Sequence, residues 1–564
     1  MMHEMLIRYR LKKQVAYIGV MIALLWAIFT FLIYPNLELI RTTLMPQAQF
    51  NIQPMMNILA SARAMNSLSH SLLLGCSLAI TVALLGLFQI LVLDYFYIKG
   101  SRWLTIAYHS PLICNGMVLV MAYNFLYGSQ GFVTALLPGL PATWFQGFWA
   151  VLIELTFAGT SNYILFVRNS LRSVDNQTIE AARNLGVSKV RILIKIVLPC
   201  LKPALLAASI IAFITGISAL ATPQVLGGTN FETINTLIYS FAQTLTTRNY
   251  AAVLAILLGC MTVTVLLISI RIEKKGYYLS VSKVKTNLSK QTIRSPFIRI
   301  TMTIIAHLIA LMQTVPLVAV FCFSFMPVTD LYAGSIQIQH FSLANYEAVF
   351  QSVAGVQPLF TSIVYAATAS LLIVLLMLCI GRLLTKHANR WTGGLEFLLQ
   401  IPWFLPSTLI ALGLLMTFNR SNPLVGGMVL TGTVFILLIG YMILVTPYTL
   451  RMIKAAYASI DRTLEDAAQN LGASSWRMYW KVVFPMLLPL VLSVFLLNFI
   501  GLLAEYDLSV FLFHPLYQPL GVVLNAATNP EAAPQAQMLS FVYSVLIMIV
   551  STTAIVLVYR QQRR

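Results

Sequence analysis

This chain has little charge for its length: only 9% of its 564 residues are Asp, Glu, Lys or Arg, whereas 59% are hydrophobic. Soluble domains carry roughly 25% charged residues, so the composition excludes a water-soluble fold. A transmembrane helix needs about 20 apolar residues, and the sequence offers twelve candidate spans. They lie near 15–34, 68–94, 103–127, 146–168, 203–222, 250–270, 300–326, 360–382, 396–417, 431–451, 487–504 and 538–559. We therefore predict an all-α membrane protein with about twelve transmembrane helices.

The motifs of several enzyme classes are also missing. The dipeptide Gly-Lys never occurs, so the chain has no G-x-x-x-x-G-K-[ST] phosphate loop with which to hydrolyse ATP. The six cysteines stand singly, without the spacing of a disulfide framework or a redox motif. His109 and His307 lie in spans and lack the spacing of zinc ligands. We predict no catalytic residues, no cofactor and no metal site.

Acidic residues are scarce: 17 Asp and Glu face 36 Lys and Arg, which gives a net charge of +19. With the N-terminus placed inside, 32 of these 36 basic residues fall in cytoplasmic segments. Only Arg41, Arg63, Arg248 and Arg420 fall outside. The positive-inside rule accounts for this asymmetry, and the basic loops also attract anionic lipid. We therefore predict cytoplasmic N- and C-termini, contact with membrane lipid, and no nucleic-acid partner.

One segment occurs twice, with an offset of 286 residues, and each copy follows the fourth span of its half. The first copy contains Glu180, Ala181, Ala182, Gly186 and Pro199, and the second contains Asp466, Ala467, Ala468, Gly472 and Pro485. Asn-Leu-Gly also occurs in both copies, at 184–186 and at 470–472. We infer two homologous six-helix halves, which an even span count leaves in the same orientation.

The duplication divides the chain into five parts. We predict a cytoplasmic N-terminus at 1–14, a first transmembrane domain at 15–270, a basic cytoplasmic linker at 271–299, a second transmembrane domain at 300–560 and a cytoplasmic tail at 561–564. The linker holds eight Lys or Arg and a single acid, Glu273. The first span lacks a small-residue cleavage site, so we expect it to remain as an anchor.

The repeated segment has the local signals of a helix, a sharp turn and a second helix. Glu180 and the two alanines after it favour a helix, and Gly186 is suited to end it with a positive φ. Ser188 is a candidate N-cap for the second helix. Pro199 and Pro203 are expected to stop that helix and begin the next span. Two interpretations remain open: a lever that a partner moves, or an ordinary helical hairpin.

The repeated segment resembles the EAA loop of type I ABC importer permeases, and the resemblance covers nearly the whole chain. It implies the transmembrane fold of that family, in a bacterial cell inner membrane. It also implies that each loop inserts a coupling helix into a pair of ABC ATPase subunits at the cytoplasmic face. A periplasmic or tethered solute-binding protein would supply the solute. The ten matched motif positions are then the coupling residues, although the second copy has Asp466 where the family has Glu.

The fused twelve-span arrangement narrows the resemblance to single-chain permeases of ferric iron and thiamine uptake. Residues 221–228, which follow the fifth span, look like the same group. Phosphonate and polyamine permeases share some of these features, so they stay as further substrate classes. Glu154 lies inside the fourth span, where it either lines the pathway or is neutralised and structural. Glu505 and Asp507 lie near an outer boundary, and we expect them to be solvated.

Two other functions compete with the importer permease. An ion-coupled secondary transporter with parallel six-helix repeats has the right span count, but it gives no reason for two matched loops. It would also favour more ionisable residues at mid-membrane. A membrane enzyme or assembly scaffold has neither a nucleophile–base pair nor a sizeable soluble domain in its favour. Neighbouring genes for an ATPase and for a secreted solute-binding protein would favour the importer.

Overall fold

The computed structural model describes residues 19, 22–45, 49–114, 116–137, 139–172, 174–275, 290–293, 295–386 and 389–562. The predicted N-terminal segment 1–14, most of the linker 271–299 and the last two residues of the tail lie outside the described residues. The described part is built from helices, with two isolated β-bridges and no strand.

The helices of the first half are α2 (Tyr34–Leu44), α3 (Gln53–Ala60), α4 (Ala62–Ile90), α5 (Ser101–His109), α6 (Met117–Tyr127), α7 (Phe132–Leu136), α8 (Phe148–Arg172), α9 (Asn176–Asn184), α10 (Lys189–Ile192), α11 (Leu198–Ser218), α12 (Ala221–Leu226), α13 (Ile234–Ala242) and α14 (Arg248–Lys275). Those of the second half are α15 (Pro296–Phe323), α16 (Val328–Tyr332), α17 (Ala344–Gln351), α18 (Val353–Lys386), α19 (Arg390–Gln400), α20 (Ser407–Phe418), α21 (Val434–Ser459), α22 (Arg462–Asn470), α23 (Ser475–Met478), α24 (Phe484–Leu503), α25 (Ser509–Leu512), α26 (Leu520–Ala527) and α27 (Pro534–Gln562).

Among the described residues, ten continuous helices are long and apolar enough to cross a membrane. Two further pairs pass the same test but are bent at a short break, so the number of spans reaches twelve if each pair counts as one. This confirms the predicted all-α membrane fold. The first continuous span runs from Ile22 to Leu44 and therefore ends ten residues later than the sequence suggested.

The third span of each half, predicted near 103–127 and 396–417, is broken in the structure. Ser101–Leu112 and Met117–Leu136 meet at 106°, and Arg390–Trp403 and Ser407–Phe418 meet at 102°. Proline stands at each break, as Pro111 in the first half and as Pro402 and Pro406 in the second. A proline removes one backbone donor and disfavours a helical residue before it, so the chain turns where a straight helix would lose hydrogen bonds.

The two halves repeat the same internal contacts. In the first, the Ser71 hydroxyl on α4 accepts a hydrogen bond of 2.8 Å from the Ile234 amide at the start of α13. In the second, the Ser362 hydroxyl on α18 accepts one of 2.7 Å from the Leu520 amide at the start of α26. Both hydroxyls are buried, and each satisfies a helix N-terminal amide that would otherwise lack a partner. The duplication inferred from the repeated segment is thus present in the fold.

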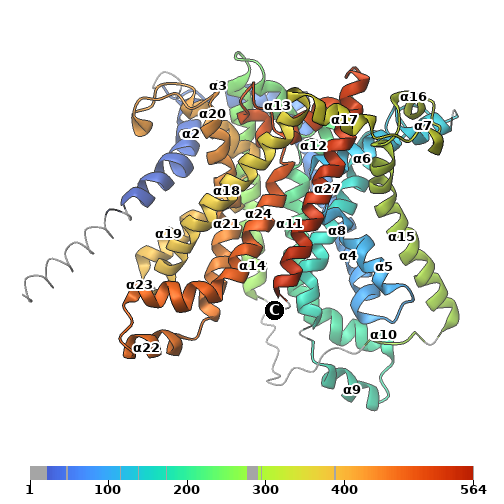
Figure 1. Cartoon of the computed structure of the whole chain (residues 1–564), viewed down its shortest axis with the longest axis horizontal. Helices are drawn as coiled ribbons and strands as arrows, with labels where there is room; N and C mark the ends of the chain where they lie inside the picture. Colours follow the sequence, from blue (N-terminus) through green and yellow to red (C-terminus); the bar gives the residue numbers. More distant parts are fainter. Residues whose placement is uncertain are drawn as a thin grey trace, which may run out of the picture.

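The first helix of each half packs against the other half (Figure 1). Helix α15 begins the second half but packs along α5 and α6 of the first, where the Tyr108 hydroxyl donates to the Ala306 carbonyl at 2.9 Å. The helix that ends in α2 instead packs against α20, with the Phe31 and Phe418 rings 5.7 Å apart. The three apolar cores therefore each contain residues from both sequence halves.

Candidate functional site

The first repeated loop has the predicted helix, turn and helix. The Asp175 carboxylate caps α9 by accepting a 3.0 Å hydrogen bond from the Gln177 amide. Gly186 ends the helix with a φ of +78°, a backbone conformation in which glycine lacks the penalty of a side chain. The Ser188 hydroxyl then caps α10, at 3.4 Å from the Arg191 amide. The sequence prediction for this loop is confirmed at the level of backbone geometry.

The second loop repeats that geometry with different side chains. Asp461 accepts a 2.9 Å hydrogen bond from the Thr463 amide, which also lowers the pKa of this carboxyl. Gly472 has a φ of +80°, and the Ser474 hydroxyl lies 3.3 Å from the Arg477 amide. The turns match as well. Amide 185 donates to carbonyl 181 and amide 471 to carbonyl 467, both at 3.1 Å.

The two prolines of each motif do not stop the second helix, which corrects the prediction. Lys189–Ser218 and Ser475–Leu503 are each one continuous span. A π-helical turn precedes Pro199 and another precedes Pro485, at Leu193–Val197 and Tyr479–Val483. The wider turn changes the hydrogen-bond pattern where proline brings no amide. As a result, the helix after each turn belongs to the fifth span of its half, and the loop cannot tilt without moving that span.

Both loops project from the same end of the molecule, at opposite sides of it (Figure 1). Glu180 and Ala181 are exposed, as are Asp466 and Ala467. The side chain before each turn glycine is a leucine that is almost fully exposed: Leu185 at 84% and Leu471 at 89%. A large apolar side chain placed in water at the tip of a rigid loop is suited to contact with another protein. The Asn-Leu-Gly match contains this signal, but the sequence analysis gave the leucine no role.

Glu154 lies next to a contact between the two halves. It is 2% exposed on α8, and its carboxylate accepts a 2.9 Å hydrogen bond from the Thr222 hydroxyl on α12. The neighbouring Ala221 amide donates to the Asp507 carboxylate of the second half at 3.3 Å. Positions 221 and 507 are related by the 286-residue offset of the repeat, so the link after the fifth span contacts its own counterpart.

Glu505 and Asp507 are partly buried and hydrogen-bonded, whereas the sequence suggested that they are solvated. Glu505 caps α25 by accepting hydrogen bonds from the Leu508 and Ser509 amides at 2.8 and 3.0 Å. Burial raises the pKa of Asp507 to about 7, and the nearby charge of Glu505 contributes, while the Ala221 amide opposes the shift. The sequence missed this arrangement because the short helix α25 folds the outer segment back between the halves.

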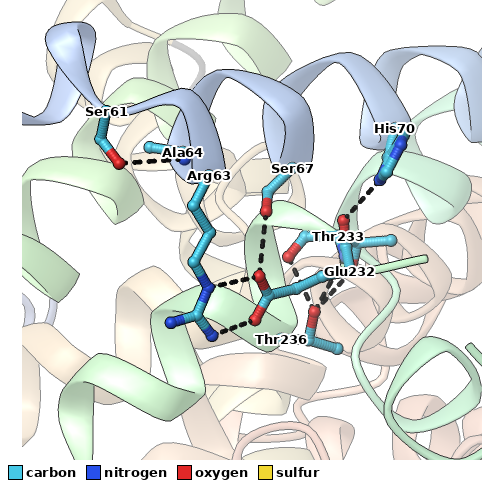
Figure 2. Close-up of polar contacts among 8 residues, drawn as sticks. All are labelled: Ser61, Arg63, Ala64, Ser67, His70, Glu232, Thr233 and Thr236. Carbon is cyan, nitrogen blue, oxygen red and sulfur yellow. Dashed lines mark hydrogen bonds and ion pairs between the residues drawn. The ribbon is translucent and has the colours of Figure 1, made fainter. Parts of the chain in front are cut away.

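An ion pair joins α4 to the segment before α13 at the outer end of the first half (Figure 2). Arg63 on α4 donates two hydrogen bonds to the Glu232 carboxylate, at 2.7 and 2.8 Å. His70 lies about two turns further along α4, and one of its ring nitrogens is 3.0 Å from the Glu232 carbonyl. This network fixes the turn that leads into α13. The 291-residue offset between Ser71 and Ser362 relates Arg63 to Ala354, and the 286-residue offset relates Glu232 to Gln518. Alanine and glutamine cannot form such an ion pair.

The described residues hold no group of three or more His, Cys, Asp or Glu side chains that could bind a metal ion. His109 and His307 each place one ring nitrogen 2.8 Å from a backbone carbonyl one turn earlier, at Thr105 and Thr303. These contacts fit a structural role for both histidines.

Comparison with known proteins identifies relatives along the whole chain. The family model described as binding-protein-dependent transport system inner membrane component matches residues 17–273 and 377–564. A probable ABC transporter permease of Sinorhizobium fredii is 34% identical over 98% of this chain and 97% of its own length. A ferric transport system permease of Actinobacillus pleuropneumoniae is 24% identical over 88% of this chain and 71% of its own length. A putative 2-aminoethylphosphonate transport system permease of Salmonella paratyphi A is 23% identical over 37% of this chain and 78% of its own length.

Proposed function

Because this chain belongs to the family of inner membrane components of binding-protein-dependent transport systems, we propose that it is the permease subunit of an ABC importer. It moves a small solute inward by alternating access between the two halves. A separate pair of ABC ATPase subunits supplies the energy, and a periplasmic or tethered solute-binding protein delivers the solute. The positive-inside distribution supports an orientation in which both termini and both repeated loops face the cytoplasm.

The observation that carries the proposal is the matched geometry of the two loops. Each presents an acidic residue, an alanine and a leucine to solvent on a short capped helix: Glu180, Ala181 and Leu185, then Asp466, Ala467 and Leu471. The remaining motif residues shape that helix and its connection to the span: Ala182, Gly186, Pro199, Ala468, Gly472 and Pro485. Two equal docking elements suit a partner that is itself a pair of similar subunits.

The continuous helices beyond the turns support a mechanical role. When the ATPase pair closes, it draws the two loops together, and each loop moves the span to which it is joined. That movement separates the outer ends of the halves, so solute enters from its binding protein. ATP hydrolysis then restores the inward-facing state. Glu154, next to a contact between the halves, is the residue we place on the pathway.

We propose ferric iron as the first substrate to test, ahead of thiamine, phosphonate and polyamine. Relatives named as ferric permeases match 88% of this chain, whereas the phosphonate relatives match 37% or less.

The test is co-purification and ATP turnover of the chain with its candidate ATPase, the product of a neighbouring gene. Leu185→Asp plus Leu471→Asp should abolish ATPase binding and the stimulation of ATP turnover by the loaded binding protein. Leu245→Asp is the matched control, since Leu245 is 76% exposed in an outer segment, and it should behave as wild type. Solute transport without any ATPase, unaffected by the loop changes, would overturn the proposal in favour of an ion-coupled transporter.

A further inference from the structure

The second loop is fastened to its half by an ion pair. Arg382, near the end of α18, donates from its two terminal nitrogens to the two carboxylate oxygens of Glu465 on α22, at 2.5 and 2.7 Å. Only 18% of the arginine side chain and 15% of the glutamate side chain are exposed. A paired, two-pronged contact of this kind fixes direction as well as distance. Helix α22 therefore cannot slide along α18 while the pair is intact.

Two tyrosines hold the guanidinium in place. Its central carbon lies 5.8 Å from the ring centre of Tyr457, at the end of α21, and 5.9 Å from that of Tyr479, in the π-helical turn. Their hydroxyls lie 3.0 Å apart. The ring of Tyr457 approaches to 3.3 Å from where a side chain on Gly381 would begin, so the glycine makes room for it. Arg382 thus joins α18, α21, α22 and the turn that leads into α24.

The first half has apolar residues at the same two places. The 286-residue offset relates Glu465 to Ile179, and the 291-residue offset between Ser71 and Ser362 relates Arg382 to Leu91. Ile179 is 2% exposed and belongs to a large apolar cluster, and Leu91 packs against the same cluster. The first half therefore has apolar side chains at the two positions where the second half has an ion pair.

We propose that Arg382 and Glu465 form a strut that positions the second loop and passes its movement to α18, so that the two arms of the importer are built differently. This inference rests on the proposed function. Both are positioning residues, because neither is exposed enough to meet a partner or a solute directly. Removing one member of this ion pair should destabilise the contact between α18 and α22, since the other member keeps a poorly compensated charge in a low-dielectric setting. Lys386, 3.9 Å from Glu465, gives only partial compensation.

The first experiment measures backbone amide exchange of the full chain in detergent. Arg382→Leu should speed exchange across 462–470 by about tenfold and leave 176–184 unchanged, so the first loop is the internal control. Arg382→Leu plus Glu465→Ile transplants the apolar pair of the first half and should restore most of the protection. Glu396→Gln is the matched control: it breaks the 2.6 Å pair with Lys454 in the same half without touching α22.

The second experiment measures coupling in vesicles that contain the chain and its candidate ATPase. The probe is radioactive ferric iron delivered by the loaded binding protein, and the readout is iron imported per ATP hydrolysed. We expect Arg382→Leu to lower this ratio at least fivefold while ATP turnover persists, the double variant to regain it, and Glu396→Gln to leave it unchanged. If Arg382→Leu imports as much iron per ATP as the wild type, the strut proposal is overturned. This holds even if amide exchange across 462–470 is faster in the variant. A wild type without ATP-driven uptake of iron, thiamine, phosphonate or polyamine refutes the proposed function, and the strut falls with it.

Discussion

The turn glycines give a prediction whose size can be worked out from the structure. Gly186 has a φ of +78°, and a methyl group added there would meet nothing within 4 Å. Gly186→Ala therefore introduces no clash, and its cost is the conformational penalty of a left-handed residue, about 1–2 kcal/mol. This penalty falls on the end of α9, where amides 185 and 187 donate to carbonyls 181 and 182. At about tenfold per 1.4 kcal/mol, opening of these bonds should become roughly 5–30 times more frequent.

Hydrogen exchange resolved to single amides checks this prediction. Amides 185 and 187 should exchange faster in Gly186→Ala, and amides 471 and 473 should do the same in Gly472→Ala. Gly139→Ala is the control, because Gly139 is exposed, has equal room for a side chain and is not among the glycines of positive φ. Unchanged exchange in both turn variants would refute the argument that the left-handed residue holds the loop in shape.

Three further outcomes follow from buried or paired charges. Glu154→Gln keeps an acceptor for the Thr222 hydroxyl and should leave the thermal midpoint nearly unchanged while it slows solute uptake, whereas Glu154→Leu strands that buried hydroxyl and should cost about 1–3 kcal/mol. Asp507 has an ordinary pKa of 3.8 and a pKa of about 7 in the folded chain, so between these pH values it is protonated when folded and ionised when unfolded. The stability that this group contributes therefore falls as pH rises through that window. The thermal midpoints at pH 5 and pH 8 should differ less in Asp507→Asn than in the wild type. Arg63→Gln removes a partly exposed ion pair with Glu232 and should cost no more than about 1 kcal/mol. High salt should reproduce this loss in the wild type but not in the variant.

Local signals predicted the repeated loops well, because the caps and the turn glycine act within a few residues of one another. Asp175, Ser188 and Gly186 each determine their own neighbourhood, and the second copy repeats them. The prolines were predicted less well. Pro199 was expected to end a helix, but a π-helical turn keeps the span continuous, whereas Pro111 marks a real break. Hydropathy alone cannot separate these two outcomes, since both segments are apolar enough to pass as spans.

Contacts between distant segments lay beyond the sequence. Nothing near α15 indicates that Ala306 accepts a hydrogen bond from Tyr108 of the other half. The partial burial of Glu505 and Asp507 depends on how the outer segment folds back, which hydropathy does not report. No local signal marks the role of Glu465, because its partner Arg382 stands 83 residues away.

The duplication preserved backbone geometry and let side-chain chemistry diverge. The turns of the two loops have the same hydrogen bonds and nearly the same φ, which is expected if two similar partners must dock on both. Residues that face inward are free of that requirement, since each needs only to fit its own half. The second half has the ion pair of Arg382 with Glu465, and the first half has the apolar residues Leu91 and Ile179 at the equivalent positions. An apolar contact tolerates small shifts, whereas a two-pronged ion pair does not, so the second arm should follow its loop more rigidly than the first.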